Sequence, residues 1–202
     1  MLEKHNITQT TMKVLSLYND DYLKSLHLRE VARRTKTDVN TIQAQLKKLE
    51  KINVLSSTIR GKNKEYVLNL DNVITRYYLT MAEIFATIIY LQKNFLIKKT
   101  MIEIGNKIDG PLVLFGSFVK GGYTKESDID LFAIREGGIV REHFRMRDLV
   151  GRDINIKSTD EKKFLNGMKN KDPLISEVIS NHVILKGADK FCDIMWEYYA
   201  SK

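Results

Sequence analysis

Two stretches decide how the C-terminal half of this sequence folds: Pro111-Leu112-Val113-Leu114-Phe115-Gly116-Ser117 and, eleven residues after the serine, Asp128-Ile129-Asp130-Leu131-Phe132-Ala133-Ile134. The first is a short apolar run that ends in glycine, which predicts a buried strand entering a turn. The second predicts another buried strand, with Asp128 and Asp130 on one face because side chains two residues apart in a strand point the same way. Two strands joined by one loop therefore bring a Gly-Ser turn and a carboxylate pair to one site.

The chemistry of this pair predicts a divalent cation. Asp128 and Asp130 would repel each other without one, and Mg²⁺ prefers carboxylate oxygens together with substrate phosphates and water. The hydroxyl of Ser117 and the N–H groups that open the next segment are suited to phosphate at a helix N-terminus. Lys120 adds a cation and Gly121 a position of close approach. The residues together predict a site for a nucleoside triphosphate (NTP).

The pattern Gly116-Ser117, Ser127, Asp128-x-Asp130 and a following apolar strand resembles the signature of polymerase-beta-type nucleotidyltransferases, above all the minimal branch. This resemblance implies that Asp128 and Asp130 bind metal, in a two-metal site, and act in catalysis. It further implies that Gly116, Ser117, Lys120 and Ser127 bind the nucleotide. The family commonly has a basic residue after Gly-Ser, where this chain has Phe118, so the phosphate contact is expected from Lys120.

The same resemblance implies a third carboxylate on a neighbouring strand. We assign it to Asp153, because Gly151 to Lys157 is the only alternating strand pattern downstream that contains an acid. The segment His182 to Gly187 resembles the closing strand and turn of the minimal enzymes. Similarity therefore extends over roughly residues 110–190.

Charge is concentrated in the first third of the chain. Residues 1–70 contain 13 Lys and Arg against 7 Asp and Glu, so +6 of the total net charge of +8 lies there. Localised positive charge suits a polyanionic partner, although a solvated basic face is the ordinary explanation. The first residues lack the layout of a signal peptide and the single cysteine excludes internal disulfides, so we expect a cytoplasmic protein.

Three helices and a hairpin are predicted in the basic region. Apolar periodicity predicts helices over 9–18 and 26–35 and a third after residue 38, capped by Asp38 or by Asn40, the latter in a capping box with Gln43. Strands over 54–59 and 65–68 flank a basic tip. This order resembles a winged helix-turn-helix of small prokaryotic regulators, which implies that the third helix enters the major groove of double-stranded DNA. A winged helix used for protein contacts is the alternative.

The resemblance also implies which side chains contact DNA. Polar groups near the start of the third helix are the candidates for base edges, since amides can pair bidentately with adenine: Asn40, Thr41, Gln43 and Gln45. Cations of the third helix and the wing are the candidates for phosphates: Lys47, Lys48, Arg60, Lys62 and Lys64.

A long helical pattern from Asn72 to Lys99 carries more apolar side chains than one buried stripe needs. We expect it to pack on both domains and to pair two copies into a homodimer, because DNA half-sites favour two-fold symmetry. Charged residues interrupt the apolar run, so a membrane span is not expected. Further helices are predicted over 139–150, 160–168, 173–180 and 188–199. The arginines of the first of these would steer an acceptor or be solvated.

The predicted fold is α+β, with three parts: a winged helix-turn-helix over 1–70, a linker or dimerisation helix over 71–105, and a nucleotidyltransferase α/β domain with a small mixed sheet over 106–202. The predicted function is a DNA-binding, Mg²⁺-dependent enzyme that transfers NMP from an NTP to an acceptor hydroxyl. The alternative is a transcriptional regulator whose nucleotidyltransferase domain senses a nucleotide or partner without catalysis. An acceptor hydroxyl on a partner protein is a third possibility, by resemblance to antitoxin enzymes.

Overall fold

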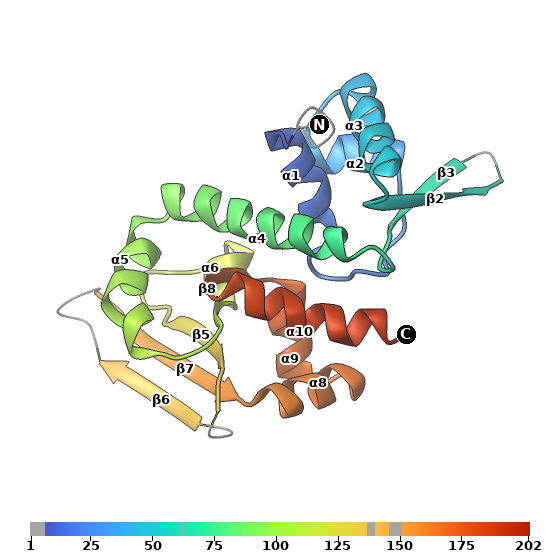
Figure 1. Ribbon diagram of the computed structural model, residues 1–202. Coiled ribbons are helices and arrows are strands. Elements are labelled where there is room, and N and C mark those ends of the chain that lie inside the picture. The colour runs from blue at the N-terminus through green and yellow to red at the C-terminus, as the bar shows by residue number, and fades with distance from the viewer. Residues whose placement is uncertain (1–6, 62, 137–139, 146–150) are drawn as a thin grey trace. The chain divides into compact units, whose positions relative to one another are not determined.

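A computed structural model describes residues 7–61, 63–136, 140–145 and 151–202 (Figure 1). The chain divides into two compact units, residues 1–85 with 199–202 and residues 86–198. We describe each unit by itself. Within the described ranges, no helix is both long enough and apolar enough to cross a membrane.

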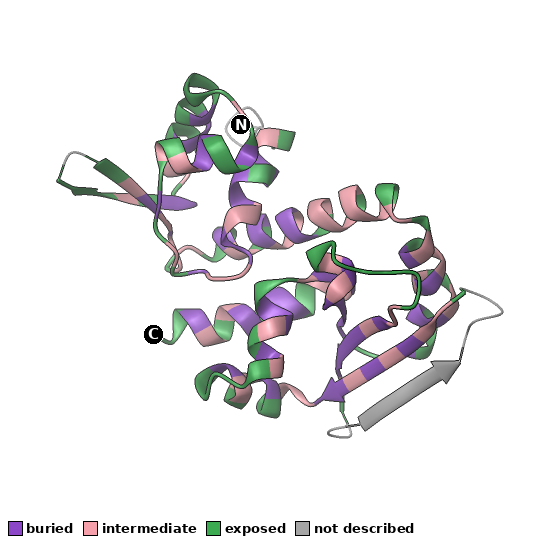
Figure 2. Cartoon of the chain, turned by 180° about the vertical axis from the view of Figure 1, so that it is seen from behind, coloured by how far each residue is buried: buried purple, intermediate pink, exposed green. Residues whose placement is uncertain are grey.

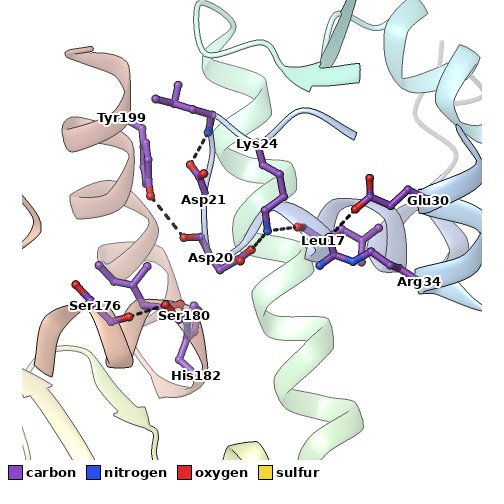
Figure 3. Close-up of polar contacts among 12 residues, drawn as sticks. Leu17, Asp20, Asp21, Lys24, Glu30, Arg34, Ser176, Ser180, His182 and Tyr199 are labelled. Atoms are coloured by element: carbon purple, nitrogen blue, oxygen red, sulfur yellow. Dashed lines mark hydrogen bonds and ion pairs between the residues drawn. The ribbon is translucent and has the colours of Figure 1, made fainter. Parts of the chain in front are cut away.

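The first unit contains the predicted three helices. Their bounds are α1 Gln9–Leu15, continued by the 3-10 turn η2 Ser16–Tyr18, α2 Leu28–Thr35 and α3 Val39–Lys51. Helix α3 is capped by Asp38, whose Oδ1 accepts from the backbone N of Thr41 at 2.8 Å. The capping box predicted at Asn40 is therefore wrong. In the η2 region, Lys24 bonds both the Asp20 carboxylate and the Leu17 carbonyl (Figure 3).

A three-stranded sheet completes this unit. Its strands are β1 Leu26–His27, β2 Leu55–Arg60 and β3 Asn63–Leu68, in the antiparallel order β1-β3-β2. The second helix was predicted to begin at Leu26, but residues 26 and 27 pair with Tyr66 and Glu65 instead. Apolar side chains of the helices form the core behind the sheet, and the Tyr18 hydroxyl donates to the carbonyl of Tyr66 at 2.9 Å.

The helical pattern over 72–99 is divided in two, as α4 Val73–Lys93 and α5 Phe95–Ile104. The prediction of one helix is wrong at Asn94, whose backbone is non-helical and whose side-chain amide donates to the Tyr90 carbonyl at 2.8 Å. Asparagine competes in this way with the backbone hydrogen bonds that would continue a helix.

The second unit is built on a five-stranded mixed sheet in the order β6-β7-β5-β4-β8. The pair β5 and β7 is parallel and the other pairs are antiparallel. The strands are β4 Leu112–Leu114, β5 Ile129–Ile134, β6 Val140–Arg145, β7 Asp153–Thr159 and β8 Val183–Lys186. The mixed sheet agrees with the sequence prediction.

Helices pack on the sheet and close its core. They are α8 Glu161–Lys169, α9 Pro173–Ser180 and α10 Ala188–Ala200, close to the predicted ranges. In Figure 2 strand β5 is mostly purple, in keeping with its buried side chains. A chain of ring contacts, from Phe115 through Phe132 and Phe164 to Phe191, joins the sheet to α8 and α10. The only cysteine, Cys192, is fully buried beside this chain.

The helix predicted over 139–150 is wrong where the structure describes it. Residues 140–145 form strand β6, which pairs antiparallel with β7 along its whole length. Residues 139 and 146–150, including Arg147, lie outside the described residues. The edge of β7 that β5 leaves open accepts this strand, and such tertiary pairing outweighs a local preference for helix.

Candidate functional site

The Gly116–Ser117 turn connects β4 to the one-turn helix α6 Ser117–Lys120. Gly116 has φ +73° and ψ −147°, a conformation that is essentially restricted to glycine. A Cβ at this position would lie 3.0 Å from Oδ2 of Asp130. The turn therefore needs glycine for its backbone and for its close approach to the carboxylate.

The predicted carboxylate pair lies beside this turn. Asp128 directly precedes β5 and Asp130 is its second residue; both are partly exposed at an end of a buried strand. The Phe115 N–H donates to the Asp130 carbonyl at 3.1 Å, which fixes the turn against the strand. The predicted union of the Gly-Ser turn with the aspartates is thus present in the geometry.

Asn155 is a member of the site that the sequence did not reveal. It lies opposite Asp130 in the parallel pairing of β5 with β7, and its Nδ2 donates to Oδ2 of Asp128 at 3.1 Å. Lys157 lies on the same face two residues later, with its ammonium 5.6 Å from the centre of the Phe115 ring. The alternating pattern of residues 153, 155 and 157 places Asn155 on the face of Asp153, but the resemblance implies only a carboxylate on this strand.

Electrostatics favour a cation at this position. Burial raises the pKa of the Asp130 carboxyl, and the charges of Asp128 and Glu177 raise it further. A hydrogen bond from Asn155 to Asp130 and the Lys157 ammonium lower the pKa of Asp130 but do not cancel the rise. A carboxylate that is costly to ionise alone gains most from a bound positive charge.

The third predicted carboxylate does not join the pair in a metal-binding cluster. Throughout the described residues, no group of three or more His, Cys, Asp or Glu side chains is arranged to hold a metal ion. Asp153 begins β7, one residue before the partner of Ile129, whereas the amide of Asn155 occupies the place beside Asp128. The two aspartates still fit Mg²⁺ that takes its remaining ligands from phosphate and water.

Two predicted nucleotide ligands make other contacts. Lys120 Nζ forms an ion pair with Glu177 Oε1 of α9 at 2.6 Å. Ser127 closes the loop before β5, where its Oγ accepts from the backbone N of Thr124 at 2.8 Å. Arg152 holds the same loop, donating to the carbonyls of Thr124 and Ser127 at 2.6 and 2.8 Å. Both Arg152 and Glu177 were missed because only the folded chain brings them to the site.

Phe118, the residue that follows the Gly116–Ser117 turn, is part of the core. Its ring stacks on Tyr123 with centroids 4.4 Å apart, and Arg152 lies over it at 5.6 Å. The Tyr90 hydroxyl donates to the Phe118 carbonyl at 3.0 Å, and burial raises the pKa of Tyr90 to about 12. This position anchors α6 instead of contacting phosphate.

The candidates for DNA contacts in the first unit fall into two groups. Most are exposed on one side of α3 or on the hairpin: Asn40, Thr41, Gln43, Lys47, Lys48, Arg60 and Lys64. Gln45 is not among them, because its side chain is buried and its amide donates to the Thr11 hydroxyl at 2.9 Å. The prediction that Gln45 faces a groove is wrong. Lys62 lies outside the described residues.

The hairpin cations contact acids of their own unit. Lys64 Nζ is 2.9 Å from Oε2 of Glu50, and Arg60 Nε is 3.5 Å from Oε2 of Glu65. The Ser57 hydroxyl also donates to Glu50, at 2.5 Å, and this bond with the Lys64 contact lowers the pKa of the Glu50 carboxyl. The contacts of Lys64 and Ser57 with Glu50 join the hairpin to α3, whereas the Arg60–Glu65 pair lies within the hairpin, and exposed pairs of this kind contribute little stability.

Comparison with known protein families finds a match for part of the second unit. No curated protein matches the chain. Residues 96–184 match the family model described as Nucleotidyltransferase domain, a range that includes β4, the Gly116–Ser117 turn, β5 and β7. This part of the chain is therefore similar to nucleotidyltransferase domains.

Proposed function

We propose that the protein is a Mg²⁺-dependent nucleotidyltransferase that moves NMP from an NTP to an acceptor hydroxyl. The observation that carries this proposal is the packing of the Gly116–Ser117 turn against Asp130, because it joins a phosphate-binding turn to a cation-binding carboxylate pair. The acceptor oxygen would bond to the α-phosphorus while its proton passes to solvent water. The bond from the α-phosphorus to the oxygen that bridges the α- and β-phosphates would break, and pyrophosphate would leave.

Asp128 and Asp130 would hold the cation, in a site that the phosphates complete. When bound, Mg²⁺ supplies positive charge for the attacking and leaving oxygens of such a displacement. Asn155 would keep the Asp128 carboxylate oriented through its 3.1 Å hydrogen bond. Lys157 would limit the negative charge that the pair presents before the nucleotide binds.

The β- and γ-phosphates would bind at the turn itself. Ser117 offers a hydroxyl and Gly116 a backbone without a side chain. Helix α6 has four residues, so its dipole adds little. Lys120 would reach the phosphates by leaving Glu177, and the exposure of both side chains allows this exchange. Ser127 would act indirectly, by shaping the loop before Asp128.

The test is incubation with each labelled NTP, Mg²⁺ and cell extract, comparing the wild type with Asp128→Asn, Asp130→Asn and Asp153→Asn. Loss of at least a thousandfold in the first two variants supports the proposal. Retention of full magnesium-dependent activity in both of them refutes the assignment. Asp153→Asn separates a two-carboxylate site from the predicted triad, since only the triad requires a comparable loss.

A sensor without catalysis is the second candidate function. It is favoured by the ion pair that holds Lys120 on Glu177 and by the lack of a three-carboxylate cluster in the described chain. NTP binding by calorimetry without transfer of label to any acceptor would support it. A labelled protein band would instead identify a partner-protein acceptor, and labelled RNA or a small molecule would identify the other acceptor classes.

For the first unit we propose a winged helix-turn-helix that binds double-stranded DNA. Asn40, Thr41 and Gln43 would face base edges, because they are exposed near the start of α3. The cations of α3 and the hairpin would contact phosphates and set affinity. Affinity for duplex DNA that is unchanged between low and high salt would refute this, because phosphate contacts release counterions.

We further propose that two copies pair through α4. The helix has exposed apolar side chains at a spacing of three, seven and four residues, Ile74, Tyr77, Ile84 and Ile88, each at least 43% exposed. The Arg76 guanidinium lies 5.0 Å from the centre of the Tyr77 ring, so the apolar contact would centre on Ile84 and Ile88. Ile84→Lys should shift the sedimentation equilibrium to monomer, whereas Lys93→Ala should not. Equal monomer content in both would refute the pairing.

A further inference from the structure

A polar hollow lies within the first unit. It measures about 530 Å³ and is lined by His27, Leu28, Arg29, Gln43, Asn63, Lys64 and Tyr66. Four elements contribute: the end of β1, the start of α2, the exposed side of α3 and the first four residues of β3.

The topology of the small sheet explains why these residues meet. β1 pairs with β3 so that His27 lies opposite Glu65, and α2 starts at the very next residue. The first turn of α2, with Arg29, is thereby brought beside Lys64. Gln43 of α3 completes the lining of the hollow. This arrangement is built into the chain rather than formed by mobile surface side chains alone.

The lining is strongly biased toward hydrogen-bond donors. Arg29 and Lys64 are cationic, Asn63 and Gln43 supply amides, and no Asp or Glu of the described residues lines the hollow. Two nearby acids lie outside the lining and contact side chains of it: Glu30 contacts the His27 ring as well as Arg34, and Glu50 contacts the ammonium of Lys64. Arg29 has no such acidic contact among the ion pairs of the described residues, so it is the cation most available to a ligand. Such a lining suits a small anion with several acceptor oxygens.

We propose that this hollow binds a phosphodiester of the DNA backbone, with Arg29 as its principal cation. The proposal rests on the DNA-binding function proposed for this unit and deepens it, because Arg29, His27 and Asn63 join the contact set. Gln43 links the two, since it lines the hollow and stands on the exposed side of α3 proposed to face base edges. A phosphate held there would fix the register of α3 on the duplex, as backbone contacts do.

The test compares Arg29→Ala with Arg33→Ala, two exposed arginines of the same helix of which only Arg29 lines the hollow. Affinity for duplex DNA is measured from 50 to 200 mM salt, on full-length protein whose fold is checked by circular dichroism. Loss of one phosphate contact should lower the slope of log K against log salt by about 0.9. We expect that change for Arg29→Ala, an unchanged slope for Arg33→Ala, and a restored slope for Arg29→Lys.

Equal slopes for Arg29→Ala and the wild type would overturn the inference, as would equal losses in Arg29→Ala and Arg33→Ala, which would indicate diffuse charge. A parallel titration with NTP and with inorganic phosphate distinguishes a free ligand. If Arg29→Ala lowers NTP binding but leaves the DNA slope intact, the hollow is a nucleotide site and the proposal is wrong. Wild-type protein without DNA affinity at any salt would instead refute the DNA-binding function itself.

Discussion

Replacement of Gly116 by alanine should damage the second unit and its site together. The residue has φ +73° and ψ −147°, where a side chain costs about 1–3 kcal/mol. The new Cβ would also lie 3.0 Å from Oδ2 of Asp130, so the carboxylate must move by a few tenths of an ångström. We expect the free energy of unfolding to fall by about 2–3 kcal/mol, which corresponds to roughly a hundredfold change in the folding equilibrium.

Two nearby glycines separate the causes of this loss. Gly121 also has a positive φ, +78°, but a Cβ there would meet nothing within 4 Å, so Gly121→Ala should show only the backbone strain. Gly122 has open space and no positive φ, so Gly122→Ala should change stability by less than about 0.5 kcal/mol. The order of destabilisation should therefore be Gly116, then Gly121, then Gly122.

Urea unfolding followed by tryptophan fluorescence measures these differences. The chain has one tryptophan, Trp196 on α10, which lies in the second unit and reports on that unit. With a typical slope of about 1–3 kcal/mol per molar urea, Gly116→Ala should lower the midpoint by roughly 1 M. A midpoint for Gly116→Ala that matches Gly122→Ala would show that the turn does not press against Asp130, and the site geometry argued from it would be wrong.

Three other predictions concern single side chains. Burial raises the pKa of Asp130, so the stabilising contribution of its protonated form is present at low pH and is lost as the pH rises through that pKa. Asp130→Asn should therefore be more stable than the wild type at pH 7 without Mg²⁺. A lower urea midpoint for the variant would contradict this. Gln45→Ala should destabilise the first unit by about 1–3 kcal/mol, measured by circular dichroism, and should leave DNA affinity intact. Gln43→Ala should weaken DNA binding and leave stability intact. Weaker DNA binding by a stable Gln45→Ala variant would refute the inward placement of Gln45. Phe164→Ala should lower the free energy of unfolding of the second unit by about 3–5 kcal/mol, measured by Trp196 fluorescence, because it removes the ring between Phe132 and Phe191. A loss below about 1 kcal/mol would refute that role.

Capping residues and apolar runs in the sequence predicted several helices and strands. The carboxylates of Asp160 and Asp172 cap α8 and α9, which begin at the next residues, Glu161 and Pro173. Strands β4 and β5 were visible as apolar runs. The break at Asn94 and the strand β6 were not, because the first depends on one side-chain bond and the second on the open edge of β7.

The residues of the candidate site likewise divide into those that the sequence predicted and those that only the fold brings together. Gly116 and the two aspartates were found because their types and spacing carry chemistry within one short stretch. Asn155 and Glu177 were not found, because the register of β5 with β7 and the placement of α9 bring them to the site from distant positions. Gln45 was misassigned, since helical periodicity alone does not distinguish a buried amide bonded to Thr11 from an exposed one.

The burial of Cys192 makes the chain a convenient host for site-specific probes. Because its thiol is enclosed by the core near Phe191, a maleimide or spin label should leave the folded protein unmodified. A cysteine introduced at an exposed residue would then be labelled selectively. Two such cysteines, one in each unit, would carry a pair of dyes, and energy transfer between them would measure whether a bound nucleotide changes the distance between the two units.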